Sequence, residues 1–180
     1  MRTIDNINDL NKSDFLSLFG NVFEKTESVA VEAFESKPFK NFEDIVFKML
    51  DIYENYEKNK ILEILNAHPE LAVAKKMTSE SISEQASAKL NQCSNDEYEE
   101  FKKLNSEYKK KFNFPFIIAV KGKDKNEILN NFRQRIQSDV ESEFLEAKKQ
   151  VKKIASFRLN EINKNCLLYT SDAADERWGG

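Results

Sequence analysis

The stretch SDVESEFLEAKKQVKKIASFRLNEI, residues 138–162, decides the fold class. Its apolar side chains recur every three or four residues at Val140, Phe144, Ala147, Val151 and Ile154, and again two steps later at Ile162. This spacing aligns them on one face of an α-helix and does not fit the alternation of a strand. Ser138 and Glu141 match a capping box, so we expect the helix to begin there. Its roughly 24 residues would extend about 36 Å.

The same periodicity recurs through the rest of the chain. It predicts helices over residues 13–22, 26–36, 41–53, 58–67, 79–90, 95–112 and 125–137, with Asn41 and Asn95 as N-caps. Gly and Pro, the main helix breakers, number only four and three. We therefore predict an all-α fold, a single compact multi-helix domain over residues 1–164.

The composition excludes several classes of function. Twenty-eight Lys and Arg stand against 31 Asp and Glu, which argues against an electrostatically driven nucleic-acid binder. One His and two distant Cys cannot build a Cys/His zinc cluster, so we expect no metal site. No apolar run approaches the ~20 residues that span a bilayer, and the opening MRTIDN lacks signal-peptide features. We expect a cytoplasmic protein with neither nucleic-acid nor membrane partners.

Residues 114–120, FPFIIAV, form the one apolar, β-branched stretch that favours an extended backbone. A single strand is not a sheet, so its amide and carbonyl groups need other partners. Neighbouring side chains would make the segment a buried connector. A ligand would make it the wall of a small-molecule site.

His68 is the only histidine and stands in the sequence LNAHP, residues 65–69. Pro69 disfavours helical backbone at the residue before it, so the preceding helix should end here. A helix C-terminus favours a protonated imidazole, whereas burial opposes it. With an ordinary pKa of about 6.5, such a side chain can exchange protons near neutral pH. The alternative is a histidine that only caps the helix.

Ser81 and Glu84 allow two interpretations. Ser81-x-x-Glu84 matches a capping box, which would turn Glu84 back onto the backbone. If the cap is Thr78 or Ser79 instead, one helical face carries Ser81, Glu84, Gln85 and Ala88 and could line a polar pocket. Three residues would then point toward the core, namely Ile82, Ala86 and Leu90.

Several other reactive or charged residues carry weaker signals. Four cations could hold a carboxylate or simply form a solvated face: Lys121, Lys123, Arg133 and Arg135. Cys93 has no second histidine to activate it, so we interpret it as structural. No Gly-rich phosphate loop or GxSxG elbow occurs.

Four motifs together resemble one family. They are LNAHPELA at 65–72, SxxEQ at 81–85, LNxxYxxKFxFPFIIAVKG at 104–122 and VxxIAxxRL at 151–159. In this order they are similar to 2-oxo-4-hydroxy-4-carboxy-5-ureidoimidazoline (OHCU) decarboxylase, which completes the conversion of urate to S-allantoin. The resemblance covers roughly residues 5–163.

The resemblance implies an all-helical, cofactor-free and metal-free carboxy-lyase of purine degradation, commonly a homodimer, acting on a small cyclic ureido carboxylate. It assigns His68 and Glu84 as catalytic. It assigns substrate binding to Pro69, Ser81, Gln85, Phe116, Ile117, Ile118, Ala119, Val120 and Lys121, the last where some members carry Arg.

The stretch FEKTESVA, residues 23–30, lacks the Pro and Trp that the family often carries there. This departure, at Glu27 and Ser28, suggests an alternative, a decarboxylase of the same fold acting on a related ureido acid. A second alternative is a non-catalytic helical interaction module in which His68, Ser81 and Glu84 are only caps.

Residues 165–180, NCLLYTSDAADERWGG, continue no helical pattern or family motif. They resemble a translated sequencing adaptor, and we interpret them as a non-native, disordered or artefactual tail; a natural disordered tail is the alternative. A natural C-terminus beyond this point could carry a peroxisomal address or a fused domain, so a peroxisomal location stays open beside the cytoplasmic one.

Overall fold

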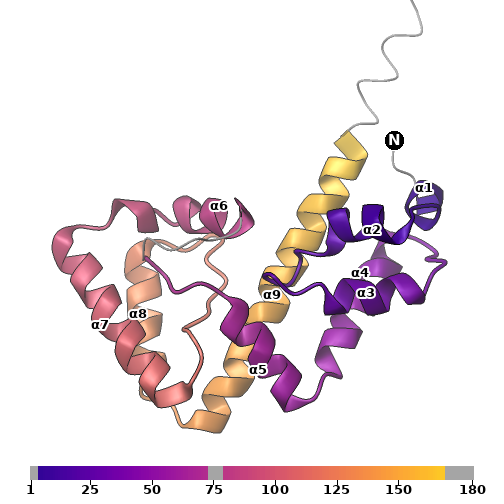
Figure 1. Ribbon diagram of the computed structural model, residues 1–180. Coiled ribbons are helices and arrows are strands. Elements are labelled where there is room, and N and C mark those ends of the chain that lie inside the picture. Colours follow the sequence, from indigo (N-terminus) through magenta and orange to yellow (C-terminus); the bar gives the residue numbers. More distant parts are fainter. Residues whose placement is uncertain (1–3, 73–78, 169–180) are drawn as a thin grey trace, which may run out of the picture. The chain divides into compact units, whose positions relative to one another are not determined.

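The computed structural model describes residues 4–72 and 79–168, and these contain helices but no strand. The elements are α1 (Ile4–Asn8), α2 (Lys12–Phe19), α3 (Ser28–Glu35), α4 (Phe42–Glu54), α5 (Lys58–Ala67), α6 (Ser79–Ser87), the 3-10 helix η1 (Leu90–Gln92), α7 (Asn95–Phe112), α8 (Lys125–Arg135) and α9 (Val140–Leu168) (Figure 1). The prediction of an all-α fold is confirmed.

Local sequence signals explain several helix boundaries. The Asn41 side chain accepts a hydrogen bond from the Asp44 backbone N–H at 2.8 Å, as expected for the N-cap of α4. α5 covers 58–67 as predicted and ends where Pro69 requires extended backbone at His68. α2 stops at Gly20, where a Cβ atom would lie 2.5 Å from the Leu16 carbonyl oxygen.

Two predicted caps are displaced by one residue. α7 is capped by Ser94 rather than Asn95, because Glu97, three residues after Ser94, completes a reciprocal capping box. At the start of α9, the Asp139 carboxylate accepts the Ser142 backbone N–H at 2.9 Å, in place of the expected Ser138 cap. A carboxylate is the stronger acceptor beside a helix N-terminus. α9 continues to Leu168, past the expected boundary at residue 164, and residues 169–180 of the predicted tail lie outside the described chain.

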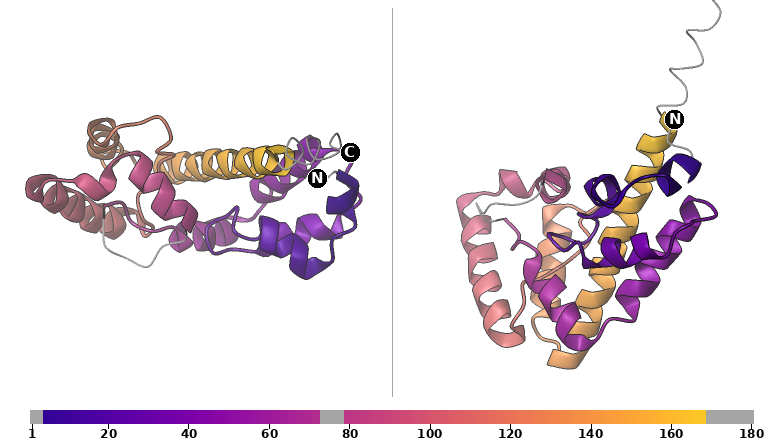
Figure 2. Two further views of the ribbon diagram at one scale, coloured as in Figure 1. Left: turned by 90° about the horizontal axis from the view of Figure 1, so that it is seen from above. Right: turned by 45° about the vertical axis from the view of Figure 1, so that its right-hand side comes forward.

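The chain divides into two compact units. The first comprises residues up to 56 together with those from 155 onward, and the second comprises 57–154. In the first unit α3 contacts both α2 and α4, and these helices can be followed in the two views of Figure 2. Phe15 stacks on Phe39 and contacts Phe19, with ring centroids 5.9 and 4.7 Å apart. Aromatic packing therefore forms much of this core.

In the second unit α7 contacts α8, and their aromatic side chains enclose the extended segment. The Phe116 ring stacks on Phe132 of α8 at 3.9 Å and meets Tyr108 of α7 edge-on at 5.3 Å. All seven residues of 114–120 are buried and none lies in a helix or strand. The extended apolar segment predicted from the sequence is thus present at the core of this unit.

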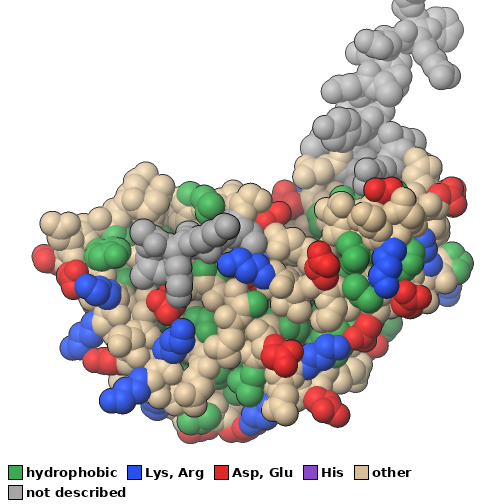
Figure 3. All heavy atoms as spheres, in the orientation of Figure 1, with side chains coloured by type: hydrophobic (Ala, Val, Ile, Leu, Met, Phe, Trp, Pro, Cys, Tyr) green, Lys and Arg blue, Asp and Glu red, His purple; other side chains and the backbone are tan. Residues whose placement is uncertain are grey.

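The surface agrees with the balanced composition. On the face drawn in Figure 3, Lys and Arg side chains are interspersed with Asp and Glu. None of the described helices is both long and apolar enough to cross a membrane.

Candidate active site

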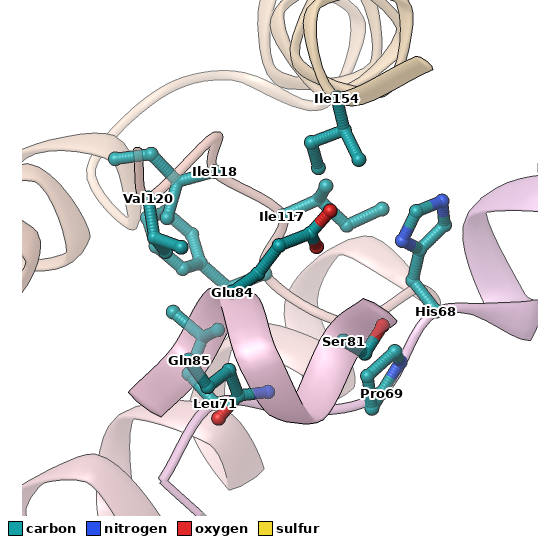
Figure 4. Close-up of a pocket in the computed structure, with 11 residues that line it drawn as sticks. His68, Pro69, Leu71, Ser81, Glu84, Gln85, Ile117, Ile118, Val120 and Ile154 are labelled. Carbon is teal, nitrogen blue, oxygen red and sulfur yellow. The ribbon is translucent and has the colours of Figure 1, made fainter. Parts of the chain in front are cut away.

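A small cavity in the second unit brings together residues from four parts of the chain. It is lined by His68, Pro69, Leu71, Ser81, Glu84, Gln85, Phe116, Ile117, Ile118, Val120 and Ile154 (Figure 4). Its volume is about 30 Å³, room for a water molecule or two. The cavity is therefore small, and it is partly open to solvent.

The imidazole of His68 enters this cavity because the helix before it ends. His68 is the C-cap of α5, with φ −68° and ψ 143°, and its backbone N–H donates to the Leu65 carbonyl at 3.2 Å. Its backbone thus closes the helix while its side chain, 8% exposed, lines the cavity. In Figure 4 the ring and the Glu84 carboxylate point toward the same space below Ile154. A role in capping α5 does not explain why the imidazole lines the cavity.

α6 supplies the polar wall of the cavity. It begins at Ser79, so Ser81 is its third residue and the Ser81–Glu84 capping box is excluded. The alternative cap at Thr78 lies outside the described residues. Ser81 and Gln85 are buried, and with Glu84 they line the cavity as the helical-face interpretation predicted.

The opposite face of α6 corrects a sequence expectation. Ile82 is 53% exposed and Ala86 is exposed, whereas both were expected to face the core. Only Leu90, in η1, is buried as expected, and Ala88, also buried, does not line the cavity. The polar face of α6 is turned inward because the Gln85 amide bonds to the loop after Pro69 and Ser81 lines the cavity.

The loop after Pro69 is held by two side-chain amides. Gln85 accepts the Ala72 N–H at 3.1 Å and donates to the Glu70 carbonyl at 3.3 Å. The buried Asn105 of α7 donates to the Leu71 carbonyl at 2.9 Å. Ala72 has φ 54°, a left-handed conformation that is costly for a residue with a Cβ and persists only when its surroundings hold it. Asn105 stands in one of the family motifs, but nothing in its sequence position predicts this contact.

Backbone groups of the extended segment find partners among neighbouring side chains. The Ile117 carbonyl accepts Arg135 Nη1 at 2.8 Å, and the Ala119 N–H donates to Gln150 Oε1 at 2.9 Å. The segment is therefore a buried connector whose backbone bonds to side chains, and four of its residues also line the cavity. Ala119 and the exposed Lys121 are not among the lining residues, and nothing in the sequence pointed to Gln150.

The candidate cations of α8 are engaged by protein carboxylates. Arg135 is buried, and its Nε lies 3.0 Å from Glu143 Oε1, which also accepts the hydroxyl of Tyr108. Burial, reinforced by the Glu143 hydrogen bond, raises the pKa of Tyr108, so this hydroxyl stays a donor. Arg133 forms two bonds to Glu100, at 2.7 and 2.8 Å. Neither arginine lines the cavity.

Two further sequence expectations concern Cys93 and metals. Burial raises the pKa of the Cys93 thiol, which donates to the Leu90 carbonyl, in keeping with a structural role. Within residues 4–72 and 79–168, no group of three His, Cys, Asp or Glu side chains is placed to hold a metal ion.

Comparison with known proteins identifies close relatives. The family model described as OHCU decarboxylase matches residues 8–160. The chain is 39% identical over 162 residues to the uric acid degradation bifunctional protein of Bacillus sp. (strain TB-90), and 35% identical over 159 residues to the 2-oxo-4-hydroxy-4-carboxy-5-ureidoimidazoline decarboxylase of Haloferax volcanii. Its fold is similar to the crystal structure of (S)-allantoin synthase, with a TM-score of 0.72 and 26% identity.

The extent of these matches differs among the relatives. They cover 90, 88 and 89% of this chain, respectively. The chain spans 32% of the Bacillus protein and 53% of the synthase chain, but 95% of the Haloferax protein.

Proposed function

Because the chain belongs to the OHCU decarboxylase family, we propose that it is a carboxy-lyase that converts OHCU to S-allantoin in urate degradation without a cofactor. The observation that carries this proposal is the cavity itself. It gathers His68, Ser81 and Glu84 with four residues of the extended segment, Phe116, Ile117, Ile118 and Val120. These are the groups that the resemblance assigns to catalysis and substrate binding.

The reaction needs an electron sink, a proton donor and a fixed substrate. The bond between the ring carbon and the carboxylate breaks, CO₂ leaves, and the electron pair passes into the conjugated ring as an enolate. A proton then adds to the neighbouring ring carbon, which carries the ureido group, while the carbon that lost CO₂ keeps its oxygen and becomes a carbonyl carbon of S-allantoin. Since the substrate ring holds the electron pair, the protein has to supply orientation, stabilisation of the oxyanion and proton delivery to one face.

The side chains divide these tasks. His68 contacts the hydroxyl and carboxylate region and handles the proton, and Glu84 orients either His68 or the substrate. The apolar side chains of Leu71, Ile117 and Ile154 line the same cavity, so the carboxylate would leave into a poorly solvated space. General acid–base help of this kind contributes about 10²–10⁴-fold.

Substrate binding is assigned to the remaining groups. Ser81, Gln85 and the backbone of 116–120 would bind the ureido and ring amides, with Pro69 lining the pocket. Ala119 and Lys121 stay in the proposed set through the resemblance, although neither lines the cavity.

The test is to generate the substrate in situ from urate and to follow S-allantoin by circular dichroism. We expect the parent protein to accelerate its formation, and His68→Ala to lower the rate about 10²–10⁴-fold. The control is Asn66→Ala, which changes an exposed side chain two residues away. An unchanged rate in His68→Ala overturns the assignment of this residue.

The same assay separates the alternatives. A non-catalytic module would neither accelerate the reaction nor show a higher melting temperature with allantoin or a similar cyclic amide, since a ligand that binds the native state must raise it. A retuned decarboxylase would turn over another ureido acid in a substrate panel. From the resemblance we also propose a homodimer in the cytoplasm, which light scattering and cell fractionation would test.

A further inference from the structure

Two side chains that do not line the cavity form hydrogen bonds with the backbone of the extended segment, at alternate residues. Arg135 of α8 holds the Ile117 carbonyl at 2.8 Å, and Gln150 of α9 holds the Ala119 N–H at 2.9 Å. Both hydrogen bonds are made to the main chain. They can therefore fix the backbone whatever side chains the segment carries.

The spacing of these two hydrogen bonds determines which way the N–H and C=O of the residue between them point. In an extended chain, the N–H and C=O of successive residues alternate between opposite sides. Ile117 and Ala119 therefore turn their peptide groups toward Arg135 and Gln150. By the same alternation, we infer that the N–H and C=O of Ile118 face the other way; Ile118 itself lines the cavity. A neighbouring donor and acceptor of this kind complement a cyclic amide or ureide.

Glu146 determines which end of the Gln150 amide meets the segment. Gln150 Nε2 donates to Glu146 Oε1, one helical turn earlier, at 2.7 Å. With its amide nitrogen held there, Gln150 presents its oxygen to the Ala119 N–H. In a flipped amide, the NH₂ group of Gln150 would face the Ala119 N–H, and its oxygen would face Glu146 Oε1. Two donors and two acceptors would then oppose each other, so the flipped arrangement is disfavoured.

We propose that Gln150, oriented by Glu146, is a positioning residue that keeps the Ile118 peptide groups turned toward a bound cyclic ureide. The identity of that ligand rests on the proposed function. The positioning itself rests only on contacts within the second unit. Gln150 acts through the backbone of Ala119, so its loss should weaken ligand binding more than it slows turnover of bound substrate.

The first variant is Gln150→Leu, which keeps much of the side-chain volume and removes the acceptor. The KM for OHCU and the Kd for S-allantoin should rise about tenfold, with a smaller change in kcat, because one buried N–H loses its partner. Gln134→Leu makes the same substitution at an exposed position of α8 and should leave both constants unchanged. A Gln150→Leu protein that folds less well but keeps the parental KM and Kd overturns the proposal.

A swap of the two side chains tests the orientation of the amide. Gln150→Glu alone puts a second carboxylate beside Glu146, and binding should weaken. Glu146→Gln alone should bind as the parent does, since its amide oxygen can still accept from Gln150. In the double variant Gln150→Glu/Glu146→Gln, the carboxylate accepts both the Ala119 N–H and the amide of residue 146, so binding should recover. A double variant as weak as Gln150→Glu contradicts the proposed orientation.

Amide hydrogen exchange separates the failure of this inference from that of the proposed function. If the parent protein neither forms nor binds S-allantoin, the proposed function fails. The Ala119 amide should still exchange faster in Gln150→Leu than in the parent and in Gln134→Leu. Equal protection of that amide in all three proteins overturns the positioning role, whatever the ligand.

Discussion

His68 shows how one neighbouring residue can set up a site. Pro69 requires extended backbone before it, so α5 ends at Ala67 and the His68 side chain leaves the helix surface for the cavity. Glu84 reaches the same space from α6 (Figure 4). The pairing of an imidazole with a carboxylate thus depends on the end of one helix and the inward face of another.

Glu84→Gln tests this pairing at constant side-chain size. The amide cannot supply the negative charge that orients His68 or the substrate, so kcat/KM for S-allantoin formation should fall about 100-fold or more. Glu80→Gln, on the exposed side of the same helix, is the matched control and should retain activity. Equal activities of the two variants would remove Glu84 from the mechanism.

At the scale of the element, single side chains determine where helices begin. Asp139 accepts both the backbone N–H and the hydroxyl of Ser142 at the start of α9. These hydrogen bonds hold the pKa of Asp139 below its ordinary value. Because the pKa is depressed in the folded state, the carboxylate stabilises α9 above the unfolded pKa of about 3.9, and this stabilisation is lost as the pH falls through the folded value.

Asp139→Asn keeps a capping acceptor but cannot ionise. We expect its melting temperature to be lower than that of the parent at pH 7. The difference should shrink as the pH falls from about 5 and disappear once the parental carboxyl is protonated. Thermal denaturation from pH 7 down to about 2 measures this, because the folded pKa lies below the ordinary value, and a difference that does not vary with pH would contradict the role of the charge.

At the scale of the whole molecule, the first unit is formed by parts of the chain that are far apart in sequence. Arg158 on α9 lies 3.1 Å from Glu24, which follows α2, and it also donates to the Asn21 carbonyl at 3.2 Å. Glu24 is fully buried, and Arg158 is 7% exposed. Removing either charge of such a pair would strand the other one in the interior.

Glu24→Gln leaves Arg158 without that counter-charge at nearly constant volume. The free energy of unfolding should fall by about 3–5 kcal/mol. Glu35→Gln, which removes the exposed partner of Lys12, should cost less than about 1 kcal/mol. Urea unfolding of both variants measures these free energies. Similar decreases in the two variants would show that the buried pair contributes no more to stability than the exposed one.

The sequence by itself determined the features that depend on local physics. Apolar residues at helical spacing predicted α3, α4, α5 and α8 within a few residues, because such a stripe can be buried only by a helix. Pro69 located the end of α5, and the β-branched run located the extended segment at 114–120. The four motifs by themselves indicated the family.

Only the tertiary structure decided between options that are locally equivalent. It turned the Ser81–Gln85 face of α6 inward and left Ile82 in solvent, because distant backbone groups, not hydropathy, meet that face. It assigned Arg135 to Glu143, and it brought Gln150 to Ala119, 31 residues away. A sequence pattern can list donors and acceptors, but which of them meet depends on the packing of elements far apart in the chain.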